Sequence, residues 1–190
     1  KYILFISRLH PKKGIEFLIN SWISLATQYE EWDLLIVGPE YDKRYVGSLK
    51  SNINNSGLTE RVIFTGMLEG QKRLDAFAAS SLFVLPSFSE NFGVAIAEAM
   101  AAKLPVITTQ GTPWEEIDVY RAGWWVQLNK NNIDDALNEA LGCHEEALTQ
   151  KGLNGYELIK KYEWKYQAIK MKQVYRYILN GGSKPVFLYE

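Results

Sequence analysis

Two glutamates separated by seven residues, Glu90 and Glu98, are the residues of this sequence best suited to bind a ligand. Glu98 lies in the apolar stretch 94–102, which predicts a helix that is buried nearly all round. No basic residue stands four positions before or after Glu98, so no ion pair within the helix neutralises it. Because a buried charge without a partner is costly, we expect Glu98 to meet ligand hydroxyl groups, a partner elsewhere in the fold, or water at a partly exposed position.

Glu90 stands just before the same predicted helix, where the helix dipole favours a negative charge. A carboxylate in this place serves either as a cap or as a ligand-binding group, and the sequence leaves both open. Eight helical residues span roughly 12 Å, which is about the distance from the ribose to the hexose of a sugar nucleotide. With Glu98 on the ribose and Glu90 on the hexose, the helix N-terminus between them offers backbone N–H groups to phosphate.

Positive charge comes from a loop near the start of the chain, in which Arg8 and Lys13 follow an apolar run. Arginine offers a planar fork to phosphate oxygens and lysine a point charge, although a solvated basic turn is the alternative. The sequence has no Asp-x-Asp motif, and its two histidines, His10 and His144, lie far apart. We therefore expect a site without a metal ion or a cofactor, in which side chains neutralise the phosphates.

Short apolar runs alternate with helical patterns along most of the chain, which predicts a Rossmann-like, doubly wound α/β sheet of about six parallel strands. In such sheets ligands bind at the carboxyl ends of the strands, where the loops that carry Arg8, Lys13 and Glu90 are expected. The predicted strands are 2–6, 34–37, 62–65, 82–85, 106–109 and 124–126, and the predicted helices are 15–29, 43–55, 72–80, 94–102, 113–120 and 133–141. Thr112 and Glu115 form a Thr-x-x-Glu capping box for the helix at 113–120.

We expect residues 1–150 to form the sheet domain, 151–180 to form helices that pack on it, and 181–190 to be a tail. The chain opens directly on a strand-like run, which suggests a fragment of a longer protein. Its net charge of −1 argues against a nucleic-acid partner. No apolar run is long enough to span a bilayer, and the single cysteine, Cys143, fits a reducing compartment.

Three segments together resemble the C-terminal domain of family 4 retaining glycosyltransferases of the group 1 type. These enzymes have the GT-B fold, in which two Rossmann-like domains face each other, and this chain resembles one of the two halves. The matching segments are Ser7-Arg8-Leu9 with Lys13-Gly14, the spaced glutamates within 89–93 and 97–101, and the run 104–107 leading into the loop 111–116. The Trp-Glu-Glu sequence in that loop resembles the corresponding loop of bacterial enzymes that build lipopolysaccharide or other surface polysaccharides.

The resemblance implies a role for each matching residue. Arg8 and Lys13 are expected to hold the pyrophosphate of a nucleoside diphosphate sugar, and Glu98 to accept hydrogen bonds from the ribose. Glu90 is expected to be the catalytic residue, binding the donor sugar and steadying its transition state. The backbone N–H groups of Asn91, Phe92 and Gly93 are expected to face sugar and phosphate, and Met67 and Leu68 to border the base.

The resemblance also implies that an N-terminal domain, absent from this chain, binds a glycan or lipid-linked acceptor. We expect a cytoplasmic hexosyltransferase that is inactive as this fragment alone. Two other classes stay open: a GT-B sugar-nucleotide epimerase or hydrolase, and a non-catalytic nucleotide-binding module. The aromatic and basic residues of 160–177 either contact the inner face of the cytoplasmic membrane or pack against protein.

Overall fold

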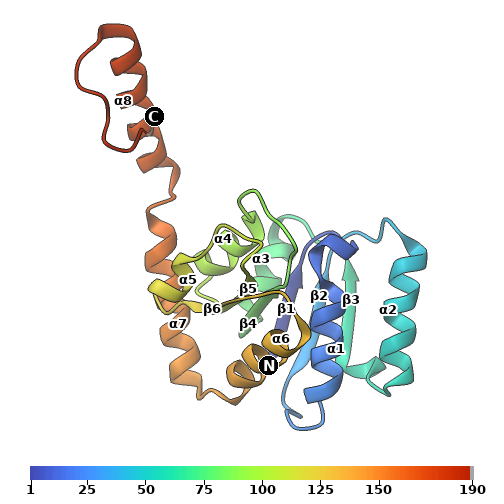
Figure 1. Cartoon of the computed structure of the whole chain (residues 1–190). Helices are drawn as coiled ribbons and strands as arrows, with labels where there is room; N and C mark the ends of the chain where they lie inside the picture. The colour runs from blue at the N-terminus through green and yellow to red at the C-terminus, as the bar shows by residue number, and fades with distance from the viewer. Residues whose placement is uncertain (189–190) are drawn as a thin grey trace. The chain divides into compact units, whose positions relative to one another are not determined.

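Six strands form one parallel sheet in the computed structural model, which describes residues 1–188 (Figure 1). The strand order is β3-β2-β1-β4-β5-β6, and every neighbouring pair is parallel. The strands are β1 (Tyr2–Ile6), β2 (Asp33–Val37), β3 (Val62–Gly66), β4 (Leu82–Leu85), β5 (Val106–Thr109) and β6 (Gly123–Val126). The Rossmann-like fold and all six strands predicted from the sequence are confirmed.

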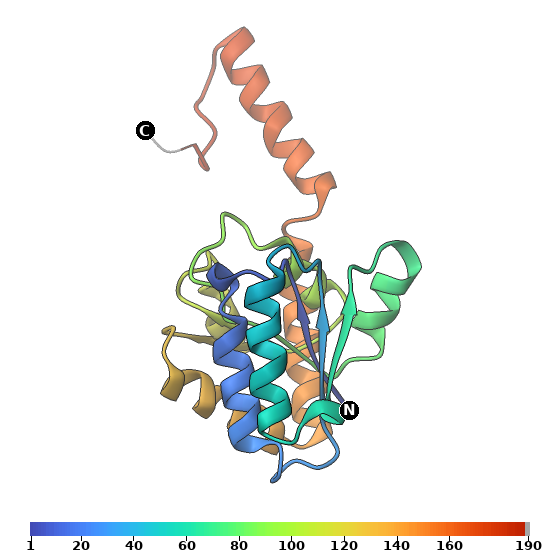
Figure 2. The same ribbon diagram turned by 90° about the vertical axis from the view of Figure 1, so that its right-hand side faces the viewer.

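Helices cover both faces of the sheet (Figures 1 and 2). On one face lie α1 (Ile15–Leu25), α2 (Lys43–Asn55) and α6 (Lys130–Gly142), where the Tyr29 hydroxyl after α1 lies 2.8 Å from Asn138 Oδ1 of α6. On the other lie α3 (Gly70–Ala78), α4 (Val94–Ala101) and α7 (Glu145–Lys160), where Gly155 of α7 packs against Met100 of α4. The sheet is therefore doubly wound, as predicted.

The strand order reverses between β1 and β4, which pair directly through Ile3 with Leu82 and Leu4 with Phe83. The chain leaves β1 towards α1 on one face of the sheet and leaves β4 towards α4 on the other. The loops after these two strands therefore diverge, and the crevice between them is where doubly wound sheets bind ligands.

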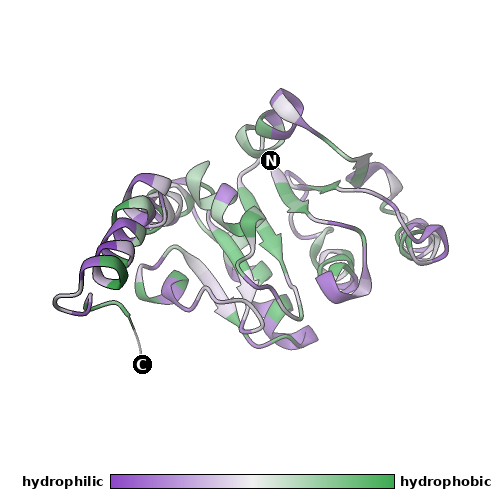
Figure 3. Ribbon diagram, turned by 90° about the horizontal axis from the view of Figure 1, so that it is seen from above, coloured by the Kyte–Doolittle hydropathy of each residue, from purple (hydrophilic) through white to green (hydrophobic). Residues whose placement is uncertain are grey.

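The core lies along the middle strands, where β4 and β5 are buried along their whole length. Figure 3 shows the strands as mostly hydrophobic and the helices as a mixture of hydrophobic and hydrophilic residues. Trp22, Trp32 and Trp114 are among the largest fully buried side chains. Burial on both faces explains why the strands appear in the sequence as continuous apolar runs.

Helix α1 ends at Leu25, four residues before the predicted end at Tyr29. The Arg61 guanidinium donates to the carbonyl oxygens of Ala26, Tyr29 and Trp32. These contacts satisfy backbone acceptors outside the helix and hold the chain in a turn that leads to β2. The remaining predicted helices agree within two or three residues, except the one at 113–120.

The predicted helix 113–120 is a single turn, α5 (Glu116–Val119), and its predicted capping box is wrong. The Thr112 hydroxyl donates to the carbonyl oxygen of Thr109 at 2.8 Å, so it does not cap the helix. The hydrogen bond instead closes the turn that follows β5, which brings Gly111 against the loop after β4.

The chain divides into a unit that covers Lys1–Leu158 and a second that begins at Ile159. Within the first unit, a Cβ added to Gly152 of α7 would lie 1.9 Å from the Lys103 carbonyl oxygen, so α7 packs closely on the sheet domain. Helix α8 (Trp164–Asn180) contains no buried residue. Its predicted packing on the sheet domain stays a prediction, and residues 189–190 of the predicted tail lie outside the described residues. No helix within 1–188 has the length and apolar character needed to cross a membrane.

Replacing Gly14 by alanine tests how tightly the loop after β1 is packed. Gly14 has φ = +65°, and a Cβ there would lie 1.9 Å from the Pro86 carbonyl oxygen. Gly57→Ala is the matched control, because Gly57 has φ = +74° with nothing within 4 Å of its Cβ position. We expect urea unfolding to show a loss of about 1 kcal/mol for Gly57→Ala and about 3 kcal/mol for Gly14→Ala. Equal losses would show that the contact with Pro86 is unimportant.

Candidate functional site

A cavity of about 330 Å³ opens at the carboxyl ends of the strands. It lies in the crevice where the strand order reverses, as the fold predicts. Its walls come from the loops after β1, β2, β3 and β4, from α3 and from the beginning of α4. The lining residues are Ile6, Ser7, Arg8, Lys13, Val37, Gly38, Pro39, Tyr41, Met67, Leu68, Arg73, Leu85, Glu90, Gly93, Val94 and Ala95.

The loop after β1 presents its cations through a short 3₁₀ turn, Pro11–Lys13. His10 caps the turn, because its Nδ1 accepts a hydrogen bond from the Lys12 backbone N–H at 3.1 Å. Gly14 then adopts a left-handed conformation as the N-cap of α1. This geometry turns Lys13 towards the cavity, while Arg8 reaches it from the start of the loop.

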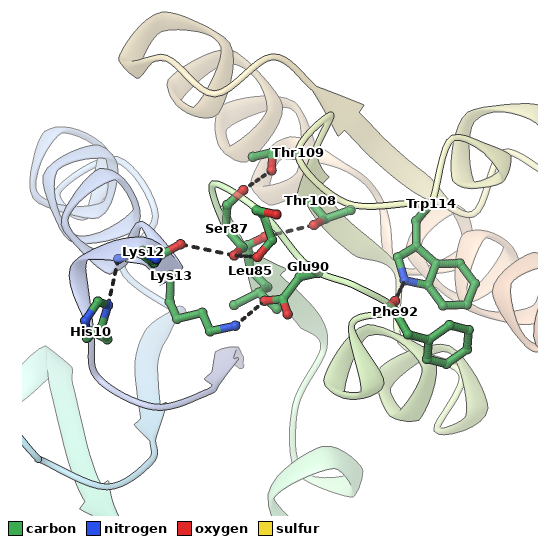
Figure 4. Close-up of polar contacts among 11 residues, drawn as sticks. His10, Lys12, Lys13, Leu85, Ser87, Glu90, Phe92, Thr108, Thr109 and Trp114 are labelled. Atoms are coloured by element: carbon green, nitrogen blue, oxygen red, sulfur yellow. Dashed lines mark hydrogen bonds and ion pairs between the residues drawn. The ribbon is translucent and has the colours of Figure 1, made fainter.

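The loops after β1 and β4 are joined through the Lys12 carbonyl oxygen. It accepts hydrogen bonds from the Phe88 backbone N–H at 3.0 Å and from the Ser87 hydroxyl at 3.1 Å (Figure 4). The Ser87 carbonyl oxygen in turn accepts from the Thr109 hydroxyl of β5. The segment that carries Glu90 is thus held by its neighbours on both sides.

Glu90 itself is fixed by its backbone and by its side chain. Its N–H donates to the Gly111 carbonyl oxygen at 3.0 Å. Its Oε1 lies 2.6 Å from Lys13 Nζ, and each of the two side chains is 14% exposed (Figure 4). This ion pair joins two residues predicted to bind a ligand. Lys13 contacts Oε1 of Glu90 and not the second carboxylate oxygen, Oε2.

The segment between Glu90 and α4 packs against Trp114. The Trp114 indole N–H donates to the Phe92 carbonyl oxygen, and the two rings lie 5.1 Å apart between centroids (Figure 4). Gly93 then adopts φ = +77°, and a Cβ there would lie 2.9 Å from Ile96 Cδ1 and 3.1 Å from the indole nitrogen. This left-handed backbone conformation favours glycine, so a side chain on residue 93 would strain the turn that leads into α4.

Helix α4 points its N-terminus into the cavity. It begins at Val94 after Gly93, with no side-chain cap, and Val94 and Ala95 line the cavity wall. The first N–H groups of a helix have no partner within it and carry partial positive charge. Together with Arg8 and Lys13, this end of α4 makes the cavity suited to an anionic group such as a phosphate.

The structure corrects the physical argument made for Glu98. The Arg73 guanidinium of α3 forms two contacts with its carboxylate, Nη2 with Oε2 and Nε with Oε1 at 3.4 Å. The Glu98 side chain is 39% exposed, so it is neither fully buried nor unpaired. Two of the three expected explanations for Glu98, a partner elsewhere in the fold and partial exposure, are therefore present. Its role on a ribose stays a prediction.

The estimate of 12 Å between Glu90 and Glu98 does not hold in the form in which we made it. It assumed eight helical residues, but α4 begins at Val94, so half of that stretch is loop. The Gly93 turn interrupts the path, and the rise of an α-helix does not apply to it. The spacing in sequence alone therefore does not set the distance between the two carboxylates.

The other predicted site residues fall around two adjoining cavities. Met67 and Leu68 line the first cavity, together with Arg8, Lys13, Glu90 and Gly93. Asn91 and Phe92 line a second one, of about 480 Å³, that shares Arg8, Lys13, Glu90 and Gly93 with the first. Of the residues predicted for the site, Glu98 lines neither cavity.

Sequence reasoning missed Arg73 and Tyr41, which also line the first cavity. Tyr41 follows β2, and the loops after parallel strands lie at the carboxyl edge of the sheet, so its place could have been found from the strand pattern. Arg73 lies inside α3, and nothing in the local sequence links it to Glu98, which is 25 positions away. The pairing depends on α3 and α4 lying side by side on one face of the sheet.

A protein-family model described as "Glycosyl transferases group 1" matches residues 1–143 of the chain. The chain belongs to this family of glycosyltransferases. The family predicted from the spaced glutamates and the basic loop is thereby confirmed.

Curated relatives agree with this family. The chain is 27% identical to the phosphatidyl-myo-inositol mannosyltransferase of Mycobacterium leprae, over 97% of this chain and 48% of that protein. It is 29% identical to the lipopolysaccharide core biosynthesis mannosyltransferase LpsB of Rhizobium meliloti, over 62% of this chain and 33% of that one. The chain therefore spans about half the length of the first of these relatives and a third of the second.

Solved structures share the fold. The C-terminal domain of a group 1 glycosyl transferase, LpcC from Francisella tularensis, has a TM-score of 0.77 and 27% identity, with 86% of each chain covered. Anabaena HepE, solved in complex with UDP-glucose, has a TM-score of 0.78 and 22% identity, with 92% of this chain and 48% of that one covered. The expectation that this chain corresponds to one half of a GT-B fold agrees with both.

Lys13→Ala tests how much the pair with Glu90 contributes to stability. The change leaves a mostly buried carboxylate without its cation, and we expect the free energy of unfolding to fall by about 2 kcal/mol. The matched control is Lys50→Ala, because Lys50 pairs with Glu40 at 2.8 Å with the two side chains 47% and 32% exposed. We expect that loss to stay below about 1 kcal/mol. Urea unfolding measures both, and a Lys13 loss no larger than the control would contradict the prediction.

Proposed function

We propose that this chain is the donor-binding half of a retaining glycosyltransferase, which transfers a hexosyl unit from a nucleoside diphosphate sugar to a glycan or lipid-linked acceptor. One observation carries the proposal: Arg8, Lys13, Glu90 and the N-terminus of α4 line the same cavity. Positive groups of this kind suit a diphosphate, and a fixed carboxylate beside them suits the sugar that it carries.

Arg8 is the proposed principal partner of the diphosphate. It is exposed, it lines both cavities, and no ion pair within residues 1–188 involves it. Its planar guanidinium can bind two phosphate oxygens at once. Lys13 adds a second positive charge and the N–H groups at the start of α4 add a third contact. In this proposal side chains and the helix neutralise the diphosphate, without a metal ion or a cofactor.

Glu90 is the proposed catalytic residue. As the bond between sugar and diphosphate breaks, positive charge develops on the sugar and negative charge on the departing diphosphate. A carboxylate held beside the sugar stabilises the first, while Arg8 and Lys13 stabilise the second. The backbone of residues 91–93 would face sugar and phosphate, Glu98 the ribose, and Met67 and Leu68 the base.

The acceptor would bind to a further domain outside this chain. This part of the proposal is supported by the relatives, one named for a mannosyl transfer to a phosphatidyl-inositol and one for lipopolysaccharide core synthesis. The solved relative in complex with UDP-glucose supports a nucleoside diphosphate sugar as the donor. We propose that the full-length protein works at the cytoplasmic face of a membrane.

Arg8→Ala tests the proposed function by isothermal titration calorimetry of the chain with UDP-glucose, GDP-mannose and ADP-glucose. We expect at least one of the three to bind to the unaltered chain. The affinity for that compound should fall about tenfold or more in Arg8→Ala, because a charge-assisted hydrogen bond to phosphate is lost.

Lys12→Ala is the matched control, since Lys12 neighbours Lys13 but lines neither cavity. Its affinity should match that of the unaltered chain, which excludes a general effect of net charge. Failure of all three sugar nucleotides to bind, or equal losses in Arg8→Ala and Lys12→Ala, would refute the proposal.

A further inference from the structure

Arg73 is the cavity residue whose contacts the proposed function does not yet use. It lies in the second turn of α3, and its guanidinium reaches across to α4, where it contacts both carboxylate oxygens of Glu98. Two parallel contacts of this kind fix the plane of a carboxylate as well as its position. The direction in which Glu98 can accept further hydrogen bonds therefore depends on Arg73.

The guanidinium is held from a second side by an aromatic ring. Arg73 Cζ lies 5.5 Å from the ring centroid of Phe77, one turn further along α3. Phe77 is 3% exposed and lies 6.2 Å from Phe83 of β4 between ring centroids, so it belongs to the core. An arginine that stacks on a fixed ring and also makes two contacts with a carboxylate is held in one orientation, because few of its rotamers satisfy both.

Arg73 also lines the cavity, whereas Glu98 does not. The ion pair therefore links a residue of the cavity wall to Glu98, whose side chain is 39% exposed and so open to further hydrogen bonds. Met67 and Leu68, which precede α3, line the same cavity. Arg73 thus belongs to the side of the cavity to which the proposed function assigns the nucleoside.

We infer that Arg73 is a positioning residue for the nucleoside: it orients Glu98 so that the carboxylate accepts from the ribose hydroxyls. An ionised carboxylate has about four acceptor positions, and the fork of Arg73 occupies two of them. The remaining two are the number that the two hydroxyl groups of a ribose require. This inference rests on the proposed function, because it takes a nucleoside diphosphate as the ligand.

A simpler reading is that Arg73 and Glu98 form an ordinary surface ion pair. Their side chains are 29% and 39% exposed, and pairs of that exposure contribute little to stability. The two readings differ in what Arg73 does to ligand selection. A surface pair leaves selection unchanged, whereas a positioning residue controls how strongly the site prefers a ribose to a deoxyribose.

The test compares a nucleoside diphosphate with its 2′-deoxy counterpart by calorimetry. UDP, GDP and ADP are titrated first, and the one that binds most tightly is used with its deoxy form on each variant. We expect the unaltered chain to prefer the ribose form about tenfold or more, as for a hydrogen bond to a charged group. In Arg73→Ala the preference should fall nearly to one and the affinity for the ribose form should fall with it.

Four further variants separate a positioning role from a structural one. Arg73→Lys should keep part of the preference, because lysine supplies the charge but not the fork. Lys72→Ala, the matched control on α3, should behave like the unaltered chain, since Lys72 is exposed and lines neither cavity. Glu98→Ala should lose the preference to the same extent as Arg73→Ala, and the double variant should lose no more than either single one.

The outcomes are distinguishable. If the unaltered chain binds a nucleoside diphosphate and Arg73→Ala keeps its preference for the ribose, the inference about Arg73 is wrong while the proposed function stands. If none of the three nucleoside diphosphates binds to the unaltered chain, the proposed function fails and the inference fails with it. A melting temperature of Arg73→Ala within a few degrees of the control variant shows that the altered selection does not come from unfolding.

Discussion

The site depends on one contact, the approach of the loop after β1 to the loop after β4. Gly14 lies against the Pro86 carbonyl group so closely that no Cβ fits. Two residues earlier, in the 3₁₀ turn, the Lys12 carbonyl oxygen accepts from the backbone N–H of Phe88 and the hydroxyl of Ser87. These strands are neighbours in the sheet but their loops lead to opposite faces, so this contact keeps the crevice narrow and brings the cations to Glu90.

The two carboxylates singled out from the sequence, Glu90 and Glu98, are both paired with cations from other elements. Glu90 is paired with Lys13 from the loop after β1, and Glu98 with Arg73 from α3. The difference lies in burial: the first pair is 14% exposed on each side, whereas the second is about one third exposed. Each carboxylate is therefore held in place by a cation of this chain, at a modest cost in desolvation for Glu98 and a larger one for Glu90.

The sequence predicted the sheet well because its strands are buried on both faces, which leaves continuous apolar runs such as 82–85 and 106–109. It also predicted the edge of the sheet at which the cavity lies, because the carboxyl ends of parallel strands meet at one edge. It could not predict the partner of Glu98, since Arg73 reaches it through the packing of two helices. The predicted helix at 113–120 was too long and its predicted cap was wrong for a similar reason. The Thr112 hydroxyl donates to a backbone carbonyl in the turn after β5 instead of capping the helix.

Under the proposed function the two basic residues of the cavity contribute differently to binding a diphosphate. Lys13 already serves Glu90, so a phosphate that approaches it must share the ammonium group with a carboxylate only 2.6 Å away. Arg8 has no carboxylate partner among residues 1–188, so no carboxylate competes with a phosphate for its guanidinium. Because repulsion between phosphate and Glu90 offsets part of the attraction to Lys13, most of the net attraction comes from Arg8 and the N-terminus of α4. The pair of Lys13 with Glu90 then serves to place the carboxylate, rather than to bind the diphosphate on its own.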